Sequence, residues 1–253
     1  MLKVKINNKI WALLIVVFTA SLIGFVEKKH AGTICLGINI RIDGKAGHHF
    51  IDNQDVLKII TNNGDDVLVG NYFSDINLKE LEKRLSSHAF VHNAEVHTDL
   101  RGNLNVNVYQ TRPIARITHS GYNDKYINDM GDIIPTSKKY TARTLLISGY
   151  VTKNLPGENL LESEYGIGLM EMIEFINEDD FWRSMIAQID IDEKGNIQLY
   201  PQIGKLVIDF GQPEEIETKF KKTLLLYEKI LPSKGWNTYV RVSVKFKNQI
   251  VCE

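Results

Sequence analysis

Apolar and polar residues alternate in three segments of the first half of the chain, Ile38–Ile42, Val91–His97 and Leu104–Val108. A period of two residues indicates half-buried β-strands. Between the first two strands, apolar residues recur at helical spacing twice: after the cap-forming stretch 52–55, and after Asn77, which Glu80 completes as a capping box. The predicted order is β-α-α-β-β, and two helices on one face of a three-stranded sheet would bury both apolar sets.

From about Thr111 onward, short strand patterns return, interrupted by two helical ones. One predicted helix ends at about Asp179; the other begins with Pro213 in its first turn and carries an apolar stripe that we expect to face the core. Glycine-containing turns at 99–103 and 193–196 are typical of hairpins. The predicted class is α+β, with this second domain a mixed α/β domain built on an extended, mainly antiparallel sheet.

The last predicted strand covers residues 239–247 and alternates throughout. Four apolar side chains point one way and four polar ones the other: Val240, Val242, Val244 and Phe246 against Arg241, Ser243, Lys245 and Lys247. One face would therefore lie on a core and the other in water. A C-terminal strand can also lie at a sheet edge, where charge either blunts the edge or the edge accepts a further strand. The two lysines fit both interpretations.

Residues 10–26 contain no charge and would span about 25 Å as a helix. We predict a transmembrane helix there, with residues 1–9 as a cytoplasmic tail, because Lys3, Lys5 and Lys9 precede it. The alternative is a cleaved signal peptide, whose apolar centre is usually shorter. In both cases the remainder of the chain lies outside the cytoplasm.

The composition is balanced: 253 residues, 30 Lys and Arg against 31 Asp and Glu, and a net charge of −1. This balance excludes a basic protein that coats nucleic acid, and the 18 Gly and 6 Pro exclude a collagen-like chain. Cys35 and Cys252 are too few for a disulfide-dense scaffold. We interpret them as two unrelated small apolar residues, although an oxidising compartment would allow a bridge.

No catalytic or cofactor-binding motif is recognisable, so we expect neither an enzyme nor a cofactor. His88 and His92 would share a helical face suited to a metal only if residues 88–92 were helical, and the strand pattern of 91–97 argues against that. The carboxylates are scattered, with no pair at a spacing suited to acid/base chemistry. Surface histidines are the simpler interpretation.

Several local patterns resemble the bacterial cell-division family FtsQ/DivIB. Phe90-Val91, Ala94 and Val96 are followed by the 99–104 turn and by Arg112-Pro113, as in the POTRA domain of that family, although Ala89 stands where members often have Pro. The 125–135 hairpin and the 208–211 strand end look like its C-terminal β-domain. The resemblance implies a POTRA domain at 35–110 and an FtsQ-type β-domain at 111–253.

The resemblance further implies a non-catalytic scaffold in the cell inner membrane, single-pass, enriched at the division septum. It implies partners of the FtsB/FtsL type, bound by strand addition at the C-terminal strand, with other divisome proteins binding through the POTRA domain. Lys245 and Phe246 occupy the basic-aromatic position that the family tends to show. The implied partner-binding residues are Tyr239, Arg241, Ser243, Lys245, Phe246, Lys247 and Asn248.

Two alternatives remain open. A POTRA-bearing component of envelope transport or assembly would share the first domain, but the chain lacks the length for a membrane β-barrel as well. An anchored periplasmic hydrolase of an unrecognised type is the other. No nucleic-acid partner is expected.

Overall fold

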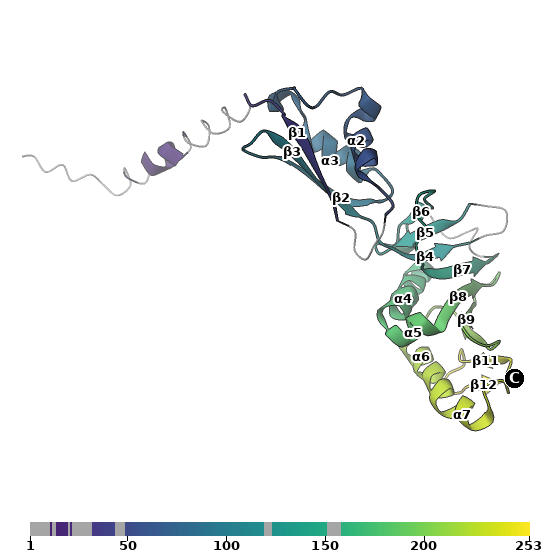
Figure 1. Ribbon diagram of the computed structural model, residues 1–253. Helices are drawn as coiled ribbons and strands as arrows, with labels where there is room; N and C mark the ends of the chain where they lie inside the picture. The colour runs from purple at the N-terminus through teal and green to yellow at the C-terminus, as the bar shows by residue number, and fades with distance from the viewer. Residues whose placement is uncertain are drawn as a thin grey trace, which may run out of the picture. The chain divides into compact units, whose positions relative to one another are not determined.

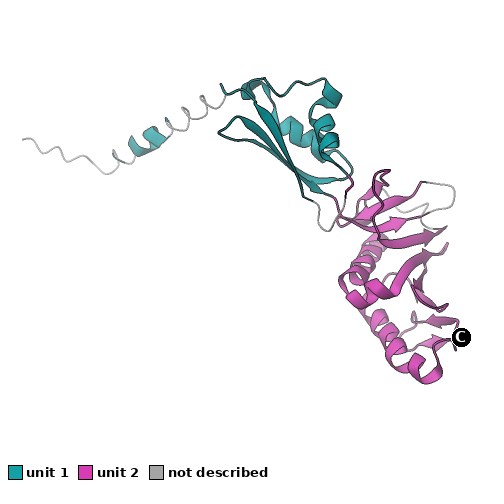
Figure 2. Ribbon diagram, viewed as in Figure 1, with its two compact units in different colours: residues 1–44, 51–110 teal, residues 45–50, 111–253 magenta. Residues whose placement is uncertain are grey.

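The computed structural model describes residues 11, 14–19, 21, 32–43, 49–118, 123–150 and 158–253. The chain divides into two compact units (Figure 2): unit 1 comprises residues 1–44 and 51–110, and unit 2 comprises residues 45–50 and 111–253. Both helices and sheets are present, so the α+β class is confirmed.

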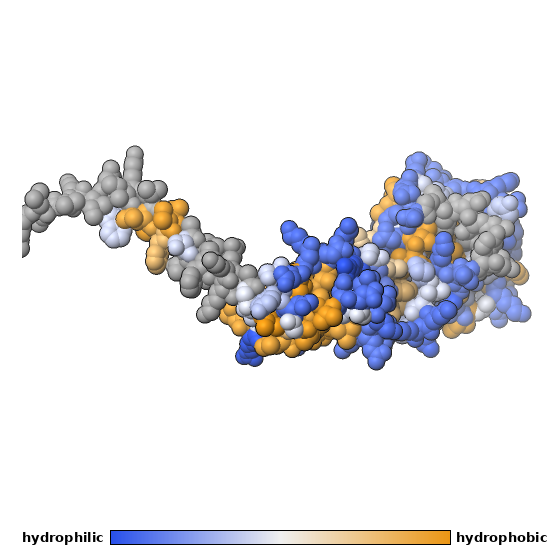
Figure 3. All heavy atoms as spheres, turned by 90° about the horizontal axis from the view of Figure 1, so that it is seen from above, coloured by the Kyte–Doolittle hydropathy of each residue, from blue (hydrophilic) through white to orange (hydrophobic). Residues whose placement is uncertain are grey.

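Of the predicted membrane segment 10–26, the structure describes Trp11, residues 14–19 and Ser21, all in helical conformation. The hydrophobic spheres beside the grey atoms at the N-terminal end in Figure 3 belong to this piece. Among the residues that the structure describes, no helix is both long enough and apolar enough to cross a membrane. The remainder of the predicted span and the predicted tail 1–9 lie outside the described residues.

Unit 1 has the predicted β-α-α-β-β order (Figure 1). Its sheet has the order β1-β3-β2, in which β3 pairs parallel with β1 and antiparallel with β2. The elements are β1 (Gly37–Asp43), α2 (Asn53–Ile60), η2 (Asn62–Gly64), η3 (Phe73–Asp75), α3 (Leu78–Ser86), β2 (Val91–Thr98) and β3 (Asn103–Gln110).

Local signals fix the helices of unit 1. Asp52 caps α2, accepting from the Asp55 N–H at 2.9 Å, and the Asp55 carboxylate accepts in return from the Asp52 N–H at 3.0 Å. This reciprocal box satisfies two N–H groups that a helix start leaves unpaired. Asn77 caps α3 by accepting from the Glu80 N–H at 3.2 Å. The core lies between sheet and helices and includes Val56, Ile60, Leu81, Leu85, Leu104, Val106 and Val108.

Unit 2 contains a nine-stranded sheet of order β12-β11-β10-β9-β8-β7-β4-β5-β6. Five of its strand pairs are antiparallel; β10 with β11, β4 with β7 and β7 with β8 are parallel, so the sheet is mainly antiparallel as predicted. Its strands are β4 (Pro113–Ile117), β5 (Lys125–Asn128), β6 (Ile133–Pro135), β7 (Leu145–Gly149), β8 (Ile186–Ile191), β9 (Ile197–Pro201), β10 (Val207–Gly211), β11 (Arg241–Ser243) and β12 (Val251–Cys252).

The helices of unit 2 run along one face of this sheet (Figure 1), and the apolar stripe predicted to face the core is buried there. Phe220 lies at the centre, with ring centroids 4.6 Å from Phe175, 4.8 Å from Trp182 and 5.2 Å from Phe210. The helices are η5 (Leu160–Glu162), α4 (Glu164–Glu178), α5 (Asp180–Met185), α6 (Ile216–Leu225), the π-helical η6 (Leu226–Ile230) and α7 (Leu231–Lys234).

The predicted start of the second helix is wrong. We expected Pro213 in its first turn, but α6 begins at Ile216. Glu215, the residue before it, has a left-handed backbone with φ 50°. A non-glycine residue in that region interrupts a right-handed helix, so residues 212–215 form a turn instead.

Candidate partner-binding site

The predicted final strand is wrong in its extent. The observed strand β11 stops at Ser243, and the chain turns through residues 244–250 into β12 (Figure 1). The turn includes Asn248, whose φ of 59° lies in the left-handed region that asparagine tolerates. Val242 and Val244 are fully buried, but Val240 is 68% exposed and Phe246 42% exposed. Ser243, predicted to face water, is buried as well, so burial does not alternate along this segment as the sequence predicted.

The interpretation of β11 as an edge strand is also wrong. It pairs in parallel with β10 on one side and antiparallel with β12 on the other, so the same chain occupies both of its flanks. The cause is the fold-back of residues 249–253, which the strand pattern did not reveal. The sheet ends at β12. We call β11, the turn 244–250 and β12 the C-terminal hairpin.

In β12, one residue, Cys252, directs its backbone N–H and C=O away from the sheet. The Arg241 N–H donates to the Glu253 C=O at 3.2 Å and the Glu253 N–H donates to the Arg241 C=O at 2.9 Å, so these two residues form a hydrogen-bonded pair. In an antiparallel ladder the next pair, Val242 and Cys252, is then not hydrogen-bonded. The N–H and C=O of Cys252 therefore point outward from the last strand.

The residues that the family resemblance suggested lie in the hairpin, except for Tyr239, which precedes it. Tyr239 packs half-buried against the core, and Arg241 and Ser243 lie on β11. The other four, Lys245, Phe246, Lys247 and Asn248, are exposed in the turn that follows. The Ser243 hydroxyl is buried and has no hydrogen-bond partner among the described residues.

Lys245 ties the turn to the neighbouring strand. Its ammonium lies 2.7 Å from an Asp209 carboxylate oxygen of β10, and it stands 5.2 Å from the centroid of the Phe246 ring. The Asp209 side chain is 10% exposed and that of Lys245 is 41% exposed. The ion pair is therefore partly shielded from solvent by the protein. It fixes the position of Lys245 and of the adjacent Phe246.

Two lysines of α6 reach backbone carbonyls. Lys219 donates to the Gln212 C=O at 2.8 Å and lies 5.1 Å from the Phe210 ring centroid; burial lowers the pKa of this lysine. Lys222 donates to the Val244 C=O and to the Phe246 C=O, the latter at 2.7 Å. Helix α6 is thus bonded through Lys219 to the turn that precedes it, and through Lys222 to the C-terminal hairpin.

Sequence reasoning missed three of these positions. Asp209 is a lone acidic residue within an apolar strand, which is a signal that could have identified it. Cys252 lies in a strand of two residues, which is too short to show a period in the sequence. Lys222 is one of several lysines along its helix, and nothing in the sequence distinguishes it.

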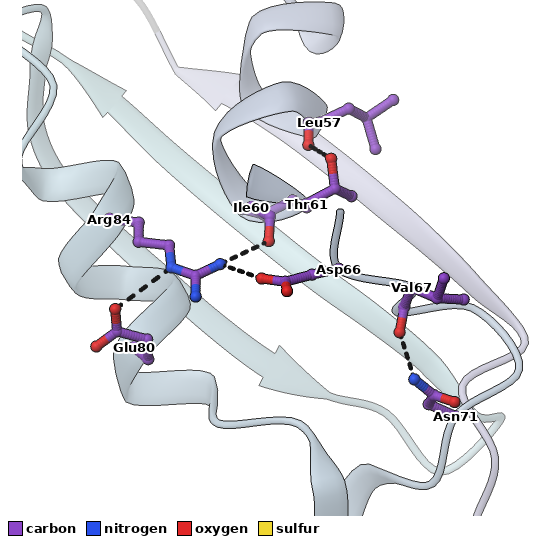
Figure 4. A network of polar contacts seen from close by, with 8 residues as sticks. All are labelled: Leu57, Ile60, Thr61, Asp66, Val67, Asn71, Glu80 and Arg84. Atoms are coloured by element: carbon purple, nitrogen blue, oxygen red, sulfur yellow. Dashed lines mark hydrogen bonds and ion pairs between the residues drawn. The ribbon is translucent and has the colours of Figure 1, made fainter. Parts of the chain in front are cut away.

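A hollow of about 350 Å³ lies in unit 1 between the loop after α2 and helix α3. Arg84 borders it, donating to the Ile60 C=O at 3.5 Å, to Asp66, and to Glu80 at 3.3 Å (Figure 4). The hydrogen bond to Asp66 raises the pKa of Arg84 above its ordinary value. These bonds use the guanidinium to join α2, the loop and α3.

Metal and thiol chemistry finds little support. Among the described residues, no three His, Cys, Asp or Glu side chains form a group able to hold a metal ion. His88 follows α3 and His92 lies in β2, so the two do not share a helical face. Burial lowers the pKa of His88. Cys35 and Cys252 are free thiols, and burial raises the pKa of each.

Comparison with known families shows a two-domain protein: a POTRA-like domain model matches residues 33–109, and a model of a cell-division family matches the domain that follows. The model described as FtsQ/DivIB, C-terminal related, matches residues 112–253, more than half of the chain. The chain therefore belongs to the FtsQ/DivIB C-terminal related family. A comparison with curated proteins finds no match. The family is one of cell-division scaffolds.

Proposed function

We propose that this protein is a non-catalytic, membrane-anchored divisome scaffold that binds an FtsB/FtsL-type partner by strand addition at its C-terminal hairpin. It would be anchored in the inner membrane by residues 10–26, with domains at 35–110 and 111–253, and enriched at the septum. Other divisome proteins would bind through the POTRA domain. The observation that carries the binding site is the sheet end at β12, within the family-matched region.

The geometry supports strand addition at β12. The outward N–H and C=O of Cys252 can pair with an incoming strand as in any sheet ladder. Because the same chain fills both flanks of β11, the partner would extend the sheet beyond β12. In this proposal the incoming backbone would lie one strand further out than the sequence suggested.

Side chains near this edge supply chemistry for specificity. Phe246 offers an exposed ring, and Val240 an exposed apolar side chain. Three cations of the hairpin, Arg241, Lys245 and Lys247, favour an acidic partner segment. Aromatic and basic anchors of this kind commonly carry the binding energy of an interface.

The test uses the full chain in detergent micelles, titrated with the periplasmic segment of an FtsB-type protein. Cys252→Pro removes the outward N–H and no hydrogen bond within the hairpin, so affinity should fall at least tenfold. Cys252→Val also removes the thiol but keeps the N–H, and should bind within twofold of wild type. Equal affinities of the two variants would reject strand addition at β12.

A second variant addresses the side chains. Phe246→Ala keeps every backbone group and should weaken binding several-fold through loss of the ring. Retention of full affinity by this variant would limit the contact to the backbone. Cells carrying the tagged protein provide the functional test, because a scaffold of the divisome should concentrate at midcell, and a uniform envelope signal would contradict the proposal.

A further inference from the structure

The ladders of the C-terminal hairpin are short. The pairing of β10 with β11 covers three residue pairs and ends at Asp209 and Ser243, and that of β11 with β12 covers two. By comparison, β1 and β3 of unit 1 pair over the whole of Gly37–Asp43. Backbone hydrogen bonds between Arg241 and Glu253, and from the Val244 N–H to Asp209, extend these pairings by one residue each. The turn between β11 and β12 has to be held by contacts outside the ladder.

Carbonyl groups beyond Ser243 need partners outside the ladder. Val244 is fully buried, and its N–H still donates to the Asp209 C=O at 3.0 Å. Its C=O and that of Phe246 both accept from the Lys222 ammonium instead. For the buried Val244 a carbonyl without a donor would be costly, and a charged donor makes a stronger hydrogen bond than a neutral one.

Lys222 is well suited to this task because its helix is fixed. Two neighbours in α6, Phe220 and Thr223, are buried against the core, so the base of the lysine side chain cannot shift. Its ammonium can make three hydrogen bonds, and two of them go to the hairpin. Lys221, the preceding residue, pairs instead with Glu217 at 2.7 Å in solvent.

We propose that Lys222 is the positioning residue of the partner-binding edge: it clamps the backbone at Val244 and Phe246, and thereby holds β12 in the sheet. This inference rests on the proposed function. It adds that binding depends on a helix residue that need not touch the partner. The clamp itself can be tested without any partner.

The experiment measures amide hydrogen exchange in the full chain in detergent micelles. The Val244 and Glu253 amides report on the hairpin, because they donate to Asp209 and Arg241. Lys222→Met should speed their exchange at least tenfold while amides of β8 and β9 exchange as in wild type. Lys222→Arg should restore most of the protection, since a guanidinium can also serve two carbonyls. Lys221→Met, the matched control, should change nothing beyond twofold.

Affinity for the FtsB-type segment is then measured on the same variants. Lys222→Met should bind at least fivefold more weakly, and Lys221→Met normally. Exchange within twofold of wild type in Lys222→Met would overturn the clamp. Faster exchange with unchanged affinity would leave the clamp standing and reject the hairpin as the binding site, so the two failures are distinguishable.

If Lys222→Met also loses protection in β8 and β9, the whole sheet is destabilised, and Lys222→Gln is used instead to test the clamp. Its amide is neutral and one bond shorter than the lysine side chain, so it should serve at most one of the two carbonyls, and hairpin exchange should lie between wild type and full exposure. Exchange as slow as in wild type would overturn the proposal.

Discussion

The two ends of the nine-stranded sheet differ in how they are closed. At the β6 end, the Ile133 N–H donates to the Glu158 C=O at 2.7 Å, Asp132 bridges to Asn159, and Pro135 lacks an N–H. The chain thus covers that edge itself, and proline blunts what remains. At the β12 end, no described residue pairs with the outward groups of Cys252. This chain closes one end of the sheet, and at the other end the residues that the structure describes leave the outward backbone groups unpaired.

The small sheet of unit 1 shows the same kind of closure at one edge. The Glu82 carboxylate of α3 accepts from the Val96 N–H of β2 at 2.8 Å, on the side of β2 away from β3. A side chain thereby occupies a backbone donor that an edge strand would otherwise expose. At each closed edge an identifiable group of this chain accepts from an outward backbone N–H. Among the described residues, β12 has no such group beside it.

The largest expected effect comes from removing the support behind the open end. Phe220→Ala leaves a cavity among three aromatic rings, which should cost about 3–5 kcal/mol of unfolding free energy. Urea unfolding followed by tryptophan fluorescence measures it, because Trp182 contacts Phe220. A loss below about 1 kcal/mol would mean that this core does not support the sheet end.

A smaller effect is expected at the bulge beside the hairpin. Gly211 has φ 78°, and a Cβ there would lie 2.9 Å from the Lys245 Cβ. Gly211→Ala should therefore cost about 1–3 kcal/mol in urea unfolding. Gly204→Ala is the control: its φ of 96° is also positive, but a Cβ there meets nothing within 4 Å. Equal losses of stability in the two variants would show that only the backbone strain of a positive φ matters, and that the contact with the Lys245 Cβ does not.

Opening the closed end should have a smaller effect still. The Asn159 amide donates to the Met130 C=O at 3.0 Å and to Asp132 at 2.7 Å. Asn159→Ala should lose about 1–2 kcal/mol of stability, measured by urea unfolding, and leave partner affinity unchanged. Partner affinity that falls with this variant would contradict the division of roles between the two ends.

The smallest effect concerns a type of turn that occurs once in each unit, away from both ends of the nine-stranded sheet. In Asp99–Asn103 and Asp192–Asn196 the aspartate accepts from the backbone N–H groups two and four residues on, each at 2.8 Å. Hydrogen bonds from the Asn103 side chain and backbone lower the pKa of Asp99 from 3.8 to about 2.

Because the folded pKa of Asp99 lies below the ordinary one, its stabilisation is present above pH 4 and disappears as the pH falls towards 2. An NMR titration of the Asp99 carboxyl should give a midpoint near 2. A midpoint near 3.8 would show that these bonds do not hold the turn in solution.

The sequence predicted unit 1 well, because its signals are local. The Asp52 cap, the turn with Gly102 and the alternation of Leu104, Val106 and Val108 each depend on neighbours in the chain. These local preferences agree with the packing that the fold requires, and such agreement makes the pattern reliable.

The open end was predicted poorly for the opposite reason. β11 ends after Ser243 because of contacts with Lys222 and Asp209, which are distant in sequence, and because the chain folds back to pair Val251 with Ser243. A two-residue strand has no periodicity to detect. The seven suggested residues do lie around the hairpin, but the edge itself, at Cys252, was not among them.

The central claim is that a partner strand adds to β12. Amide exchange of the full chain, with and without the FtsB-type segment, tests it most directly. We predict that the Cys252 amide gains at least tenfold protection on binding, while amides of β5 and β6 remain unchanged. Protection that appears at the β6 end, with Cys252 exchanging as before, would contradict the account.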